Sequence, residues 1–276
     1  MSVKTRNFPI YIILIVLAFL WFLPVWTSLL LSTKSPADYI SQKFYEMPTK
    51  LAIVDNFKEA MRTYEVHKQF LNSVYYAIFG GVIAIIFSNM AAYSIVRLKP
   101  RFNFLLFLII YSGTLFPFQM YLIPLYKMYN SIGLYNTKAG LLLVYGALCI
   151  PFALFVYRGF YVTIPKDIED AAKIDGSGPI RTFVSIFLPQ TAAPTAVVAL
   201  FQMTWIWNDL LFGMVLSRTK NVRPVMVAIA SMTGIGGGVV TIIMTAVLFT
   251  SIPTILLYIV LRKYFIRGMT MQVAGG

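Results

Sequence analysis

Charged residues are scarce in this sequence: they make up 12% of its 276 residues, whereas hydrophobic residues make up 59%. A soluble domain carries about 25% charged and about 45–50% apolar residues. This deficit of charge excludes an ordinary soluble domain and places the chain among membrane proteins. Aromatic residues reach 16% and include 17 tyrosines, a residue type that favours the boundary between water and lipid.

Residues that carry catalytic or metal chemistry are also nearly missing. The chain has one cysteine, Cys149, and one histidine, His67. One cysteine cannot form an intrachain disulfide, and neither residue has the partners that a metal site or a catalytic triad needs. No phosphate-binding loop of the form G-x-x-x-x-G-K-S/T occurs. We therefore expect no ATP site, no cofactor, no metal and no enzymatic activity in this chain.

Acidic residues are outnumbered, because 23 lysines and arginines face only 10 acids and give a net charge of +13. No basic run exceeds two residues, so the sequence lacks the basic face that nucleic-acid binding requires. The cations instead flank apolar stretches, which is typical of a membrane protein.

Six stretches have the length of about 20 mostly apolar residues that a membrane-spanning helix needs. We expect an all-α membrane protein whose single transmembrane domain covers 1–276. The first stretch is too long for a cleaved signal peptide and lacks its cleavage site, so we expect a retained anchor. The predicted spans are 8–31, 70–96, 102–126, 139–162, 190–217 and 239–261, with an outer segment at 32–68 and a cytoplasmic loop at 163–189.

Orientation follows from the basic residues. Six spans place both termini on one side of the membrane, and the cluster Arg97, Lys99 and Arg101 in a very short turn predicts that this side is cytoplasmic. Asp209 is the only carboxylate within a predicted span. Because ion-coupled carriers keep ionisable groups in the membrane, this shortage indicates that energy for transport comes from another chain.

The loop 163–189 contains a polar segment, 164–179, that predicts a short helix outside the lipid. Acidic residues gather in its first turn, where they complement the positive end of the helix dipole. Glu169 and Lys173 form a favourable i,i+4 pair, and Gly176 and Pro179 end the helix. The first-turn acids are Asp167, Glu169 and Asp170.

Two adjacent alanines on this helix, Ala171 and Ala172, permit close approach of another surface, and Asp170 offers a carboxylate to an arginine there. An ordinary solvated linker helix explains the same pattern. From the residues alone both interpretations stay open.

The spacing of this segment resembles the EAA loop of bacterial ABC-importer permeases. Asp170-Ala171-Ala172 is followed after three residues by Gly176, after nine more by Ile186, and then by Leu188-Pro189. The family usually has glutamate where this chain has Asp170. The resemblance implies that these residues couple the chain to a partner ATPase. The coupling residues that it implies are Glu169, Asp170, Ala171, Ala172, Asp175, Gly176, Leu188 and Pro189.

Further motifs resemble those of the carbohydrate branch of these permeases, in particular the second permease of maltose-type importers. They are Ala91-Ala92-Tyr93, Gln119, Ile123-Pro124-Leu125, 134–137 with Gly140-Leu141, Pro151-Phe152, Trp207-Asn208-Asp209, Arg262, Phe265 and Gly268. The resemblance implies a multi-pass protein of the bacterial cytoplasmic membrane. Its partners would be a second permease, an ATPase dimer that holds ATP and Mg²⁺, and an extracytoplasmic solute-binding protein.

Two further sites follow from this resemblance. A glycine-rich outer loop would enter the binding protein, although the same residues would suit a flexible connector equally well. The glycines of this loop are Gly234, Gly236, Gly237 and Gly238. Polar and aromatic side chains would line the substrate pathway, although helix packing is the commoner role of such residues. The pathway candidates are Asn89, Gln119, Gln202, Trp205 and Asn208.

The function implied is alternating access for a sugar or oligosaccharide. A permease for a glycerol-phosphate-type or other polar solute is the alternative. The short polar helix disfavours a stand-alone channel or carrier.

Overall fold

The computed structural model describes residues 8–232 and 239–273, and within these ranges the chain contains helices and no strand. This agrees with the predicted all-α class. The α-helices are α2 (Phe8–Thr33), α3 (Pro36–Ser41), α4 (Ile53–Arg62), α5 (Val66–Tyr93), α6 (Asn103–Tyr111), α7 (Leu122–Ser131), α8 (Lys138–Thr163), α9 (Asp167–Ile174), α10 (Pro179–Thr182), α11 (Leu188–Gln190), α12 (Ala192–Trp207), α13 (Leu211–Leu216), α14 (Val225–Ala230) and α15 (Val239–Val273). Two π-helices, η1 (Ser94–Leu98) and η4 (Phe183–Phe187), and two 3₁₀ turns, η2 (Ser112–Thr114) and η3 (Phe118–Tyr121), complete the order.

Four helical stretches are long and apolar enough to cross a membrane: Ile10–Thr33, Val66–Leu98, Lys138–Thr163 and Val239–Lys263. Two further candidates are pairs of helices that meet at a sharp bend. Asn103–Thr114 and Phe118–Ser131 meet at 86°, and Pro179–Gln190 and Ala192–Trp207 meet at 73°. The described chain thus has four spanning candidates, or six if each bent pair is one span.

The bends lie where the helical hydrogen-bond pattern fails. Pro117 precedes the second helix of the first pair with ψ at 118°, outside the helical range, and it has no N–H to donate. In the second pair, Thr191 has a ψ of 12°, and its amide donates to the carbonyl of Leu188, three residues back, rather than to the carbonyl four residues back. By contrast, Pro24, Pro151 and Pro253 lie inside continuous helices.

The chain divides into two compact units, Met1–His67 with Ala228–Ile252 and Lys68–Val227 with Pro253–Gly276. In the first unit, buried polar groups tie the end of α2 to α4. The Asn56 side-chain amide donates to the carbonyls of Ser32 and Lys34, at 2.9 and 2.8 Å. The fully buried Lys34 amino group donates to the carbonyl of Lys43 at 2.6 Å, which fixes the connection between α3 and α4.

Along α2, no residue of the most apolar window is buried. Trp21, for example, is 81% exposed. Such a continuous apolar surface is unfavourable in water and favourable in lipid or against another apolar helix. The exposure of α2 is therefore what a membrane-embedded helix requires.

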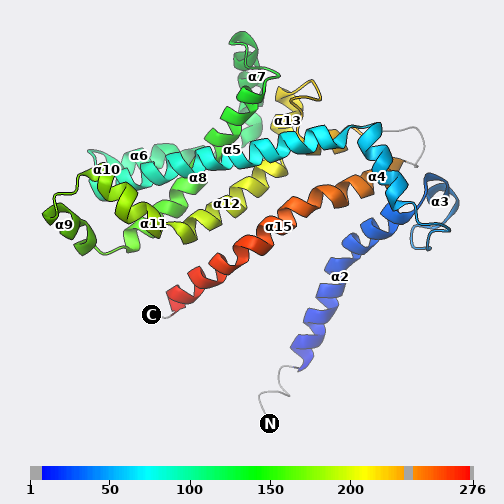
Figure 1. Cartoon of the computed structure of the whole chain (residues 1–276), viewed down its shortest axis with the longest axis horizontal. Helices are drawn as coiled ribbons and strands as arrows, with labels where there is room; N and C mark the ends of the chain where they lie inside the picture. The colour runs from blue at the N-terminus through cyan, green and yellow to red at the C-terminus, as the bar shows by residue number, and fades with distance from the viewer. Residues whose placement is uncertain (1–7, 233–238, 274–276) are drawn as a thin grey trace. The chain divides into compact units, whose positions relative to one another are not determined.

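In the second unit, α8 packs against α12 and α6 (Figure 1). Glycines allow the close approach. A Cβ on Gly146 of α8 would lie 2.7 Å from Ile83 Cγ2 of α5, and a Cβ on Gly80 would lie 2.9 Å from Ile206 Cδ1 of α12. Small residues at helix contacts are typical of membrane bundles, where packing replaces the hydrophobic drive.

One end of this bundle holds a buried cluster that bears directly on the loop 163–189. Tyr93 and Phe187 belong to it, together with Tyr161 and Ile164 at the end of α8. The rings of Tyr93 and Phe187 lie 5.2 Å apart, and Tyr93 lies 5.0 Å from Phe183. The end of α5 is thus packed against the segment that leads from the loop into α12.

Candidate functional site

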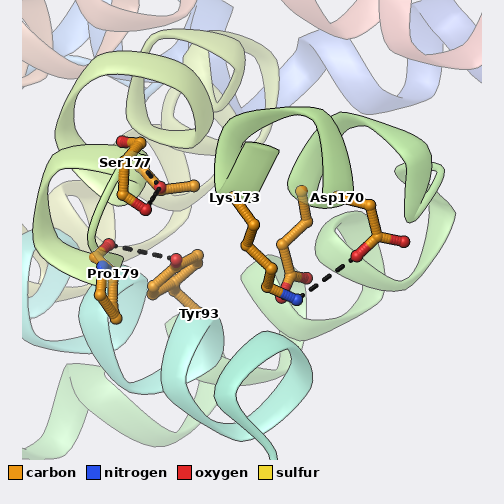
Figure 2. Close-up of polar contacts among 7 residues, drawn as sticks. Tyr93, Asp170, Lys173, Ser177 and Pro179 are labelled. Atoms are coloured by element: carbon orange, nitrogen blue, oxygen red, sulfur yellow. Dashed lines mark hydrogen bonds and ion pairs between the residues drawn. The ribbon is translucent and has the colours of Figure 1, made fainter. Parts of the chain in front are cut away.

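The polar segment of the loop forms a helix, α9, with the ends that its sequence predicts. Three acids lie in the first turn, and Lys173 lies in the last. Lys173 contacts Glu169 at 2.8 Å and Asp170 at 3.4 Å; the latter contact is drawn in Figure 2. The Glu169 carboxylate, which accepts a hydrogen bond from Lys173, raises the pKa of the Lys173 amino group.

Gly176 ends α9 because it takes a left-handed conformation, with φ at +71°. The Gly176 amide donates to the Lys173 carbonyl at 3.0 Å, and the Ser177 amide donates to the Ala172 carbonyl at 2.9 Å. These two bonds satisfy carbonyls that the helix end would otherwise leave open. Pro179 then begins α10 rather than merely terminating α9.

The predicted coupling residues divide between exposed and buried positions. Ala171 is exposed, whereas Ala172 is 3% exposed and packs within the chain. The Asp170 side chain is 64% exposed, and the Glu169 side chain is 15% exposed. Of these two carboxylates, Asp170 is therefore the one that α9 presents to solvent. The other predicted positions, Asp175, Gly176, Leu188 and Pro189, are exposed.

Sequence reasoning missed two large apolar side chains on this loop. Ile174 at the end of α9 is 87% exposed, and Ile180 on α10 is 81% exposed. The signal that could have found them is that each is an isoleucine in the mainly polar loop between two apolar spans. An exposed apolar side chain beside an exposed carboxylate is typical of a contact surface for another protein.

Two residues of the α5–η1 end fasten the loop to the bundle. The Tyr93 hydroxyl donates to the Pro179 carbonyl at 3.2 Å (Figure 2). The buried Arg97 guanidinium donates to the carbonyls of Tyr161 and Ile164, each at 2.6 Å, and lies 5.1 Å over the Phe187 ring. Both the entrance and the exit of the loop are thus attached to one helix end.

The five pathway candidates do not form one group. Asn89 is 1% exposed; its side-chain amide donates to the Thr191 hydroxyl at 3.0 Å, and its carbonyl oxygen accepts a hydrogen bond from Tyr161. Asn89 thus links α5, α8 and α12 and is a packing residue. Gln119 is exposed on η3 and lines none of the described cavities.

Gln202, Trp205 and Asn208 do come together at two cavities of the second unit. A cavity of about 800 Å³ has Trp205, Asn208 and Phe118 in its wall. A cavity of about 310 Å³ has Gln202 in its wall and shares Trp205 and Phe118 with the first. Trp207 faces away from both, is 4% exposed, and packs against Phe70.

Asp209 also lines the larger cavity, but its oxygens are already engaged. It accepts hydrogen bonds from the Tyr145 hydroxyl at 2.8 Å and from the amides of Gly213 and Phe212 at 2.9 and 3.3 Å. The two amide bonds occupy the free donors at the start of α13. Asp209 therefore interrupts the predicted span 190–217, so that α12 ends at Trp207 and α13 begins at Leu211.

The predicted binding-protein loop lies outside the described residues, which omit 233–238 and so Gly234, Gly236, Gly237 and Gly238.

Residues 84–271 match the family of binding-protein-dependent transport system inner membrane components. The chain belongs to this family. The matched region runs from within α5 into α15 and includes the whole of the loop 163–189. The predicted ABC-importer permease is thereby confirmed, and the family is one of transport subunits.

Relatives of this permease include transporters from several bacteria. It is 29% identical to the melibiose/raffinose/stachyose import permease protein MelC of Bacillus subtilis, over 100% of this chain and 99% of MelC. It is 31% identical to the trehalose transport system permease protein SugB of Mycobacterium tuberculosis, over 80% of this chain and 82% of SugB.

A solved structure has the same fold as this permease. It is the crystal structure of a bacterial ABC transporter involved in the import of the acidic polysaccharide alginate, with a TM-score of 0.84 and 22% identity. The match covers 96% of this chain and 99% of the other.

Proposed function

We propose that this permease forms, with a second permease, an alternating-access pathway for a sugar or oligosaccharide that an extracytoplasmic binding protein delivers. A cytoplasmic ATPase dimer, with its own ATP and Mg²⁺, drives the change, and this chain carries no cofactor. The chain crosses the bacterial cytoplasmic membrane six times, each bent helix pair counting as one span, with both termini in the cytoplasm.

The exposed face of α9 is the observation that carries this proposal. Asp170, Ala171 and Ile174 are exposed there together, so a carboxylate, a small side chain and a large apolar side chain face outward. An arginine in the ATPase would pair with Asp170, because an arginine–carboxylate contact is strong when partly desolvated. Ile174 would fill an apolar pocket, the usual anchor of such an interface.

The attachment of the loop supplies the coupling. Because Arg97 and Tyr93 bind backbone carbonyls on both sides of α9, the ATPase would move α9 and the end of α5 as one body. A packed bundle responds to such a displacement by changing between discrete arrangements rather than by bending continuously.

A sugar is favoured as the solute by the cavity beside Trp205 and Asn208. An aromatic face and an amide suit a sugar ring, which has apolar faces and a rim of hydroxyls. In the described part of the chain no lysine or arginine lines this cavity. A glycerol-phosphate-type solute would require such a cation, so this alternative is disfavoured. MelC and SugB are sugar permeases by name, which agrees with this preference.

Replacement of Ala171 by tryptophan tests the docking contact. The complete importer, with both permeases, the ATPase and the binding protein, is reconstituted in liposomes, and uptake of labelled oligosaccharides and of glycerol 3-phosphate is measured. We expect A171W to lose ATPase subunits during purification and to lose at least about 90% of uptake, because the indole blocks the contact.

Ala37→Trp is the matched control, since Ala37 is an exposed alanine on another helix, α3. This control should retain the ATPase. Normal ATPase binding and normal uptake by A171W would refute the docking proposal. Solute uptake by this chain alone, without an ATPase, would refute the importer mechanism as a whole.

A further inference from the structure

A basic cavity of about 370 Å³ lies between the end of η1, the start of α6 and the end of α8. We propose that it binds the phosphate group of an anionic phospholipid. Four cationic side chains line it, and in the described part of the chain no carboxylate does. The four are Arg97, Lys99, Arg158 and Lys166.

Arg97 provides a donor that the protein itself does not use. This side chain is 9% exposed, and its terminal nitrogen already donates to the carbonyls of Tyr161 and Ile164. Its Nε has no hydrogen-bond partner in the described part of the chain. A buried N–H on a charged group without an acceptor is costly, and a phosphate oxygen is among the strongest acceptors for it.

The other cations are also uncompensated. None of Lys99, Arg158 and Lys166 forms an ion pair with a described carboxylate, since the pairs found involve Lys173. Arg158 is half-buried, and its guanidinium lies 4.4 Å over the Phe107 ring, which holds it beside the cavity. Lys99 and Lys166 are exposed at the rim. Several like charges around one hollow repel one another, so a bound anion would stabilise the site.

The position and the wall of the cavity distinguish a lipid from a free anion. The apolar stretches Val66–Leu98 and Lys138–Thr163 both end here, where the chain passes from spanning helix to polar loop. Phe104 and Val162 also line the cavity, and they are 60% and 61% exposed. A phospholipid matches this combination because its acyl chains would lie against the apolar side chains and its phosphate against the cations.

The test uses native mass spectrometry of the purified importer complex, delipidated and then titrated with phosphatidylglycerol or phosphatidylcholine. The test variant is Lys99→Gln with Arg158→Gln, which leaves the buried hydrogen bonds of Arg97 intact. We expect roughly a tenfold or larger loss of phosphatidylglycerol affinity, from the attraction that each cation contributes near an anionic headgroup. The single variant Lys99→Gln, at an exposed side chain, should lose about fivefold.

Lys58→Gln with Arg62→Gln is the charge-matched control, because both cations are exposed on α4 and neither is among the residues that line this cavity. This control should retain wild-type affinity. Phosphatidylcholine, whose phosphate is neutralised by its own ammonium group, should bind the wild type more weakly. The proposal would be overturned if the wild type, the Lys99→Gln variant and the variant with Lys99→Gln and Arg158→Gln all bound phosphatidylglycerol with equal affinity.

Inorganic phosphate is the third arm, and it separates the two sources of the anion. Millimolar phosphate should not displace bound phosphatidylglycerol from the wild type, because it lacks acyl chains. If millimolar inorganic phosphate did displace the bound phosphatidylglycerol, the cavity would be a site for a free anion and the assignment to lipid would be overturned. None of these outcomes depends on which solute the importer carries.

Discussion

Replacement of Gly176 by alanine isolates the contribution of one backbone conformation to the loop 163–189. A Cβ at Gly176 would meet no atom within 4 Å, so the substitution causes no clash. The cost arises from φ at +71°, a region in which an L-residue is disfavoured by about 1–2 kcal/mol. G176A should therefore weaken the end of α9, where the amides of Gly176 and Ser177 cap the helix.

Gly178 offers a matched control two residues away. A Cβ at Gly178 would also meet no atom within 4 Å, but its φ is −71°, which any residue adopts. G178A should be neutral, or stabilising by about 0.4–1 kcal/mol through the unfolded chain. The two variants thus make the same chemical change at positions whose native φ values have opposite signs.

Hydrogen exchange of the reconstituted importer, read by mass spectrometry over peptides covering 167–182, measures the effect. In G176A the opening equilibrium of the cap amides should rise about 5–30-fold, which corresponds to the 1–2 kcal/mol above. In G178A exchange should be unchanged or slower. If the two variants exchanged alike, the conformational argument would be refuted.

Two further predictions concern contacts of the second unit. Tyr93→Phe removes the hydrogen bond to the Pro179 carbonyl but keeps the ring, so it should cost about 0.5–1.5 kcal/mol of stability and speed hydrogen exchange in α10. Tyr45→Phe, at an exposed tyrosine, is the control and should leave hydrogen exchange in α10 unchanged. Gly146→Ala should lower the thermal stability of the purified complex because its Cβ would lie 2.7 Å from Ile83 Cγ2, and adding Ile83→Ala should restore part of the loss. Equal melting temperatures for the single and double variants would contradict this packing argument.

Local chemistry made α9 predictable from its sequence. Acids in the first turn, the Glu169–Lys173 pair and a glycine at the end all act within a few residues of one another. They therefore predict the helix without knowledge of the rest of the fold. The same signals could not separate Ala171 from Ala172, because which of two adjacent residues is buried depends on the surface that packs against the helix.

The surroundings of the pathway candidates could not be predicted from the sequence, because they depend on contacts far apart in the chain. Asn89 and Gln202 are both amides in apolar spans, and nothing local distinguishes them. Asn89 meets Thr191 and Tyr161, which lie about a hundred and about seventy residues away, and so becomes a packing residue. Gln202 instead faces a cavity. The break at Asp209 likewise results from a carboxylate that accepts two backbone amides rather than from apolar content.

The π-helices η1 and η4 precede and follow α9 in the chain. Each is closed by a backbone hydrogen bond that reaches back five residues, from the Lys99 amide to the Ser94 carbonyl and from the Leu188 amide to the Phe183 carbonyl. A turn of this kind holds one residue more than an α-turn, so everything beyond it is rotated by about 100° relative to a regular helix. In η4 the chain continues directly into α11, so this rotation applies to Leu188 and Pro189. Loss of one residue from η4 would therefore turn these two predicted coupling positions by about 100° about the helix axis.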